Sequence, residues 1–135
     1  MAFDSSSGKL RLLDKQSTVD SAYQGPNEPA EVRVHPGGAL VYVNNRGEDS
    51  VAWFRAGTDG ELSRLGHVSI SRSVHPGLAA RSFAFDPSGS FLLVADRPAN
   101  LIRSYAVDVE TGDLRPLTEV AVADPAFIVF VELGV

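Results

Sequence analysis

Two stretches of this sequence repeat each other. Residues 30–62 read AEVRVHPGGALVYVNNRGEDSVAWFRAGTDGEL, and residues 81–114 read RSFAFDPSGSFLLVADRPANLIRSYAVDVETGDL. Pro36 and Gly38 match Pro87 and Gly89 at an offset of 51 residues. A partial third copy precedes them, because residues 4–10 match residues 108–114 at an offset of 104, about twice as large. A period near 50 residues is typical of a β-propeller, in which each repeat forms one blade.

Each repeat consists of short apolar runs separated by turn residues, without the spacing of an amphipathic helix. We predict strands at 31–35, 40–44, 50–55 and 62–70 in the first repeat. In the second repeat we predict strands at 82–86, 91–95, 101–107 and 114–122. Four antiparallel strands per unit are the content of a propeller blade. The sequence therefore predicts an all-β chain, a propeller segment of about two and a third blades.

The units have predicted bounds and predicted turn residues. Residues 1–29 form the end of an incomplete blade and a connection, 30–74 and 75–123 are two full blades, and 124–135 supply the inner strand of a following or closing blade. The second strand of each blade is continuously apolar, as expected where both faces of a sheet are covered. Gly8, Gly60 and Gly112 are expected to supply a positive φ between third and fourth strands.

Composition narrows the function classes. The net charge is −5 and no Lys/Arg cluster occurs, which argues against nucleic acid or an anionic membrane as partner. The longest apolar runs are far shorter than the roughly 20 residues of a transmembrane helix. Without cysteine, and with no apolar leader at the N-terminus, a cytoplasmic protein is expected. No nucleotide- or phosphate-binding motif is present, so we predict no cofactor.

Three runs carry a resemblance to a known family: PAEVRVHPGG at 29–38, VNNRGEDSV at 43–51 and RSFAFDPSG at 81–89. They resemble the lactonase family of seven-bladed propellers, which includes 6-phosphogluconolactonases and carboxy-muconate lactonizing enzymes. The resemblance runs from Phe3 to Val131 and corresponds to the C-terminal portion of that family. It implies hydrolysis of a sugar-acid lactone such as 6-phosphogluconolactone; cycloisomerisation of carboxy-cis,cis-muconate is the enzymatic alternative.

An unclosed arc of blades would expose unpaired strand edges and uncovered apolar faces. We therefore expect self-association through the open blade edges. A non-catalytic β-repeat module that binds another copy or another protein is the alternative to an enzyme.

Glu31 begins an innermost strand, and such strands line the channel where propellers bind ligands. A carboxylate there could act as general base on a water that attacks the lactone carbonyl. The structural alternative is an ion pair with an arginine such as Arg33 or Arg81. Glu31 corresponds to Ser82 in the second repeat, so the repeat itself does not require a carboxylate.

Arg81 stands directly before the second innermost strand, at the position of Ala30. Its guanidinium could hold a carboxylate or phosphate, or stabilise an oxyanion. A structural ion pair between blades is the alternative. The family pattern that the sequence resembles has proline before this arginine, and Ala80 replaces it here.

Arg46 and His35 are the predicted substrate-binding residues. Arg46 lies in a turn and is repeated as Arg97, so turn stabilisation competes with anion binding as its role. His35 shares the strand face of Glu31 and is a candidate for proton transfer. His35, His67 and His75 are far apart in the sequence, and no metal site is predicted.

Overall fold

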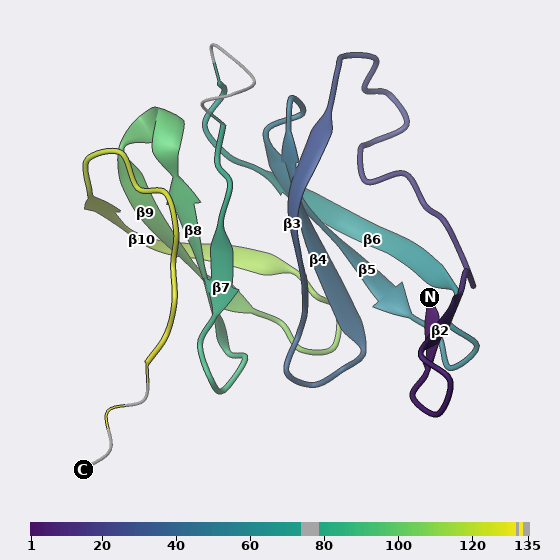
Figure 1. Ribbon diagram of the computed structural model, residues 1–135. Coiled ribbons are helices and arrows are strands. Elements are labelled where there is room, and N and C mark those ends of the chain that lie inside the picture. The colour runs from purple at the N-terminus through teal and green to yellow at the C-terminus, as the bar shows by residue number, and fades with distance from the viewer. Residues whose placement is uncertain (74–78, 132, 134–135) are drawn as a thin grey trace.

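The computed structural model describes residues 1–73, 79–131 and 133, whose strands form antiparallel sheets only (Figure 1). A hairpin of β1 (Ala2–Asp4) and β2 (Lys9–Arg11) comes first. The first full blade has the order β3-β4-β5-β6 and the second β7-β8-β9-β10. Their strands are β3 (Glu28–Val34), β4 (Leu40–Arg46), β5 (Ser50–Ala56), β6 (Leu62–Ser69), β7 (Phe83–Phe85), β8 (Phe91–Asp96), β9 (Leu101–Val107) and β10 (Leu114–Ala121). A short 3-10 turn, η2 (Arg97–Ala99), joins β8 to β9.

The predicted fold class is confirmed. Each of the eight strands expected in the two repeats is present, and each blade has the simple up-and-down strand order of a propeller. Gly8, Gly60 and Gly112 have φ values of 68°, 87° and 86°, as the turns between third and fourth strands require. The inner strands β3 and β7 lie beside each other in Figure 1, and β6 and β10 form the opposite edges of the two sheets.

The main core lies between the two blades. It is built from buried side chains on the facing sheets and on the connector before β7: Leu40, Tyr42, Val51, Trp53, Ala80, Phe83, Leu92, Val94, Tyr105 and Leu114. Tyr42 is fully buried, and its hydroxyl donates to the carbonyl of Gly112, 2.7 Å away in the other blade. A Cβ at Gly112 would lie 2.6 Å from Cδ1 of Trp53. Trp53 therefore packs between the blades, and Gly112 lets the two blades approach closely.

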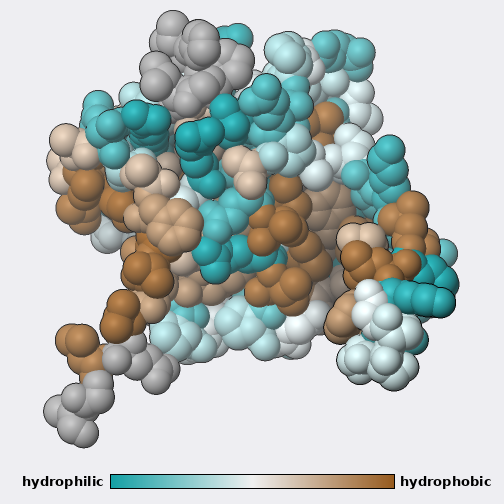
Figure 2. All heavy atoms as spheres, in the orientation of Figure 1, coloured by the Kyte–Doolittle hydropathy of each residue, from teal (hydrophilic) through white to brown (hydrophobic). Residues whose placement is uncertain are grey.

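Apolar side chains are exposed at both ends of the arc. The N-terminal hairpin region exposes Met1, Phe3, Leu10 and Leu12, and the C-terminal segment exposes Phe127, Val129 and Val131. Figure 2 shows hydrophobic side chains gathered at the hairpin and along the extended C-terminal segment. These surfaces lie where neighbouring blades would pack in a closed propeller.

The C-terminal segment passes beside β7 (Figure 1). Ile128 is buried against Ala84 and Ala95, and its N–H donates to Ser82 Oγ at 3.2 Å. Residues 124–131 form no strand among the described residues, so the expected inner strand of a further blade stays a prediction. No helix in the described part of the chain is long and apolar enough to cross a bilayer.

Candidate functional site at the inner strands

Glu31 lies in a bulge of β3. The pairing of β3 with β4 shifts register between Pro29 and Val32, so two residues of β3 face Asn44 alone. The Glu31 side chain is 16% exposed, and its Oε1 accepts hydrogen bonds from Arg33 at 2.6 and 2.9 Å. Glu31 thus forms the ion pair with Arg33 that the sequence left open as its structural alternative.

The other carboxylate oxygen of Glu31 reaches across to the second blade. Oε2 accepts a hydrogen bond from the backbone N–H of Phe83 at 2.9 Å. Phe83 is the first residue of β7 and is fully buried. Glu31 therefore joins the two innermost strands, at the place where the sequence predicts a ligand-binding channel.

Arg81 precedes β7 by two residues and is exposed. Its side chain makes no hydrogen bond or ion pair with the part of the chain that the structure describes. The neighbouring residues Ala80 and Ser82 are both buried, so the backbone on either side of Arg81 is held in the core. The structure thus presents a guanidinium from a fixed backbone, close in sequence to the Phe83 N–H that Glu31 binds.

Arg46 ends β4 and has a side chain that is 13% exposed. It forms an ion pair with Glu28 at 3.3 Å, within its own sheet. Its repeat counterpart Arg97 also pairs with a carboxylate, that of Asp124. The hydrogen bond from Arg97 lowers the pKa of Asp124. Carboxylate pairing in both blades is consistent with turn stabilisation, and anion binding by Arg46 stays a prediction.

His35 follows β3 and is buried. Its Nδ1 accepts a hydrogen bond from Gly37 N–H at 2.9 Å, so Nε2 carries the proton and donates to the carbonyl of Gly89 at 2.9 Å. The ring also meets the edge of Phe85, with centroids 5.1 Å apart. His35 therefore links the turn after β3 to the turn after β7. These turns lie at the opposite end of the inner strands from the connector that precedes β7 (Figure 1), so Arg81 and His35 are not brought together.

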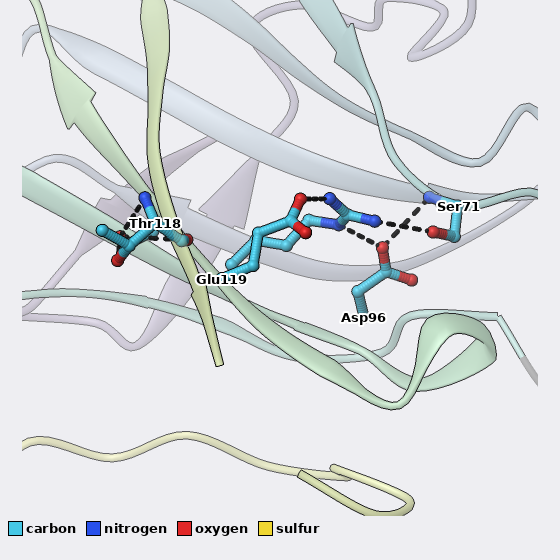
Figure 3. A network of polar contacts seen from close by, with 6 residues as sticks. Ser71, Asp96, Thr118 and Glu119 are labelled. Carbon is cyan, nitrogen blue, oxygen red and sulfur yellow. Dashed lines mark hydrogen bonds and ion pairs between the residues drawn. The ribbon is translucent and has the colours of Figure 1, made fainter. Parts of the chain in front are cut away.

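A buried ion pair within the second blade, which also binds the connector from the first blade, was not predicted from the sequence. Asp96 is fully buried, and its Oδ2 accepts hydrogen bonds from Arg103 Nε at 2.5 Å and from the backbone N–H of Ser71 at 3.1 Å. Arg103 also bonds Ser71 Oγ and Glu119, as Figure 3 shows. The network fastens the connector between the blades to β8 and β9.

The repeat contains a signal for this ion pair. Asp96 stands at the position of Asn45, and Arg103 stands at the position of Ala52. Two complementary charges thus replace two uncharged residues of the first blade. A comparison of the repeats for paired departures, rather than for shared motifs, could have identified the ion pair.

A cavity of about 500 Å³ lies beside this network, between β6 of the first blade and β9 and β10 of the second. Its lining includes Val68, Arg103, Tyr105 and Thr118, and it contains neither Glu31 nor Arg81. Within residues 1–73, 79–131 and 133, no group of three or more His, Asp or Glu side chains could hold a metal ion. His75 lies outside the described residues.

Repeated four-stranded sheets packed face to face around adjacent inner strands define a β-propeller protein. The chain belongs to the lactonase family: residues 1–130 match the family described as "Lactonase, 7-bladed beta-propeller".

Named relatives agree with this assignment. The chain is 37% identical to a 6-phosphogluconolactonase of Formosa agariphila over 115 residues, which cover 83% of this chain and 31% of the relative. It is 31% identical to a 6-phosphogluconolactonase of Pectobacterium carotovorum over 120 residues, 88% of this chain and 34% of the relative. The chain thus spans about a third of the length of these relatives.

Solved structures show the same partial coverage. A protein from Lactobacillus plantarum matches with a TM-score of 0.87 and 27% identity, over 96% of this chain and 37% of that protein. A periplasmic gluconolactonase of Pseudomonas aeruginosa matches with a TM-score of 0.78 and 28% identity, over 88% of this chain and 32% of that enzyme.

Proposed function

We propose that this chain is part of a lactonase propeller that hydrolyses a sugar-acid lactone, as a 6-phosphogluconolactonase does. The observation that carries the proposal is the identity of 31–37% to two proteins of that name over most of this chain. The same relatives favour lactone hydrolysis over the cycloisomerase alternative.

In the proposed reaction, Arg81 binds the anionic part of the substrate or the oxyanion that forms at the lactone carbonyl. Its exposure and its lack of a partner among the described residues support this role. Arg46, the second arginine at this end of the blades, contributes to anion binding. His35 is bonded at both ring nitrogens, so a role in proton transfer would require one of those bonds to break.

Glu31 acts as the general base. Its Oε1 is bound by Arg33, whose side chain is 38% exposed and can turn towards solvent. A water that replaces Arg33 gives a proton to Oε1 and attacks the carbonyl carbon. The ring C–O bond then breaks, and the proton passes from Glu31 to the leaving alkoxide. Phe83 N–H holds Oε2 throughout.

Location and association are further proposals. A cytoplasmic location is expected from the composition, although the Pseudomonas relative is named periplasmic. Self-association is supported by the exposed apolar side chains of the N-terminal hairpin and of residues 127–131. Light scattering of the purified chain tests it: a discrete oligomer supports association, and a monomer at high concentration contradicts it.

The proposed activity can be tested in a chimera. The matched segment of the Formosa agariphila enzyme is replaced by this chain, so that the remaining blades are supplied, and hydrolysis of 6-phosphogluconolactone is followed by pH-stat. We expect turnover well above the spontaneous rate. Glu31→Gln is expected to lower kcat by roughly a hundredfold or more, as loss of a general base does.

Glu61→Gln is the matched control, because Glu61 is an exposed glutamate in the turn between β5 and β6. A folded chimera without turnover would contradict the proposed function. Equal turnover in the Glu31 and Glu61 variants would contradict the role of Glu31 as general base but not the proposed function.

A further inference from the structure

Asn44 lies at the point where the bulge of β3 meets the second blade. Its side chain is 1% exposed. Because the bulge interrupts the ladder between β3 and β4, the N–H of Glu31 has an acceptor other than a backbone carbonyl. It donates to Asn44 Oδ1 at 3.1 Å.

The other end of the same amide crosses to the second blade. Asn44 Nδ2 donates to the carbonyl of Ala80 at 2.6 Å. Ala80 directly precedes Arg81 and is itself buried. A side-chain amide carries an acceptor oxygen and a donor nitrogen on the same carbon, so Asn44 satisfies one backbone group in each blade.

A second cross-blade bond holds the same segment at its other end. Glu31 Oε2 accepts from Phe83 N–H at 2.9 Å. Arg81 is thus enclosed between two anchored residues, with Ala80 bound by Asn44 and Phe83 bound by Glu31. The geometry fixes the backbone of Arg81 relative to the bulge that bears Glu31.

The second blade does not repeat this arrangement. Ala95 stands at the position of Asn44 and carries no polar group. Ser82, which stands at the position of Glu31, still accepts a backbone N–H from the following segment, that of Ile128. In both blades the side chain at the Glu31 position therefore accepts a hydrogen bond from a backbone N–H of the following segment. The bonds of Asn44 occur only in the first blade, whose following segment carries Arg81.

We propose that Asn44 is a positioning residue for the lactone site: it fixes the Ala80–Phe83 segment against the β3 bulge and so sets Arg81 relative to Glu31. The part of this inference that concerns substrate rests on the proposed function. The part that concerns the backbone does not.

The first part of the test uses the full chain and three variants. Asn44→Ala removes both bonds and introduces the residue of the second blade, and Asn44→Asp keeps the acceptor for Glu31 N–H while losing the donor to Ala80. Asn45→Ala is the matched control, because Asn45 is also buried and loses bonds to Thr18 and Ser50 instead. All three variants lose hydrogen bonds of a buried amide, but only the Asn44 variants lose the bond to Ala80, in the segment that carries Arg81.

The first readout is amide hydrogen exchange by NMR. We expect Asn44→Ala to speed exchange of the Glu31 and Phe83 N–H groups about tenfold relative to Asn45→Ala, as loss of a buried hydrogen bond would. Asn44→Asp should protect Glu31 N–H more than Asn44→Ala does. Unchanged exchange at both amides in Asn44→Ala overturns the proposal.

The second readout is the affinity of the chimera for 6-phosphogluconate, measured by calorimetry with the same substitutions. We expect Asn44→Ala to weaken binding about tenfold, and Asn44→Ala combined with Arg81→Ala to bind no more weakly than Arg81→Ala alone. Additive losses overturn the positioning role. If the chimera with the unsubstituted chain does not bind this ligand while the exchange result is as expected, the proposed function fails and the backbone role stands.

Discussion

The Tyr42 hydroxyl offers the sharpest test of how the two blades are held together. Tyr42→Phe keeps the ring and its packing but removes the donor to the Gly112 carbonyl, which lies 2.7 Å away across the blade interface. Burial raises the pKa of Tyr42, in keeping with a phenol that is shielded from water. An unsatisfied buried carbonyl costs about 1–3 kcal/mol.

Urea denaturation measures this cost. With an m-value of about 2 kcal/mol/M, a loss near 2 kcal/mol lowers the urea midpoint by about 1 M. Tyr23→Phe is the matched control, because its hydroxyl donates to Pro26 O at 2.9 Å in an exposed loop, where water can replace the donor. We expect this control to move the midpoint by less than about 0.25 M, for a cost below about 0.5 kcal/mol. Equal shifts in the two variants would refute the claim that Tyr42 couples the blades.

Three further outcomes are expected. Gly112 and Gly8 lie in repeat-related turns and both have positive φ, but an added Cβ would clash only at Gly112. In thermal melts we expect Gly8→Ala to destabilise the fold by about 1 kcal/mol and Gly112→Ala to destabilise it clearly more. Equal losses of stability would contradict the close contact between the blades. The pKa of Asp4 is lowered to about 2, and the largest cause is the hydrogen bond from the Ser6 side chain. Because the pKa in the folded state is below the ordinary value, ionised Asp4 stabilises the hairpin above about pH 4. This stabilisation is lost as the pH falls towards 2. Carboxyl NMR titration of Ser6→Ala should show a raised pKa of Asp4, and an unchanged value would contradict the assignment. His35→Phe keeps a ring but removes the bond within its own turn and the bond to Gly89 that links the two turns. Chemical denaturation should therefore show a loss of about 1–3 kcal/mol, and a neutral result would count against the link.

The strands of the two blades could be predicted because the repeat aligns their apolar runs. The differences arise where side chains act on the backbone. β3 begins at Glu28 rather than Glu31, since the bulge after Pro29 lets a proline enter a strand. β7 ends at Phe85 because Asp86 bonds the N–H groups of its own turn.

The sequence could predict which residues belong to the site, but it could not predict the contacts that join them. Departures from the repeat singled out Glu31 and Arg81, and they fall on adjoining segments of the structure. The bonds that join them depend on residues 36 and 52 positions apart, such as Asn44 with Ala80 and Glu31 with Phe83. Such pairings follow from how blades face each other, which one repeat does not specify.

The central claim, that Arg81 serves a lactonase site between the inner strands, is tested most directly by kcat/KM for 6-phosphogluconolactone in the chimera. Arg81→Ala is compared with Arg115→Ala, which removes an exposed arginine from the outer strand β10. The account predicts a loss of roughly a hundredfold for Arg81→Ala and less than about twofold for Arg115→Ala. Equal values for the two variants would contradict it.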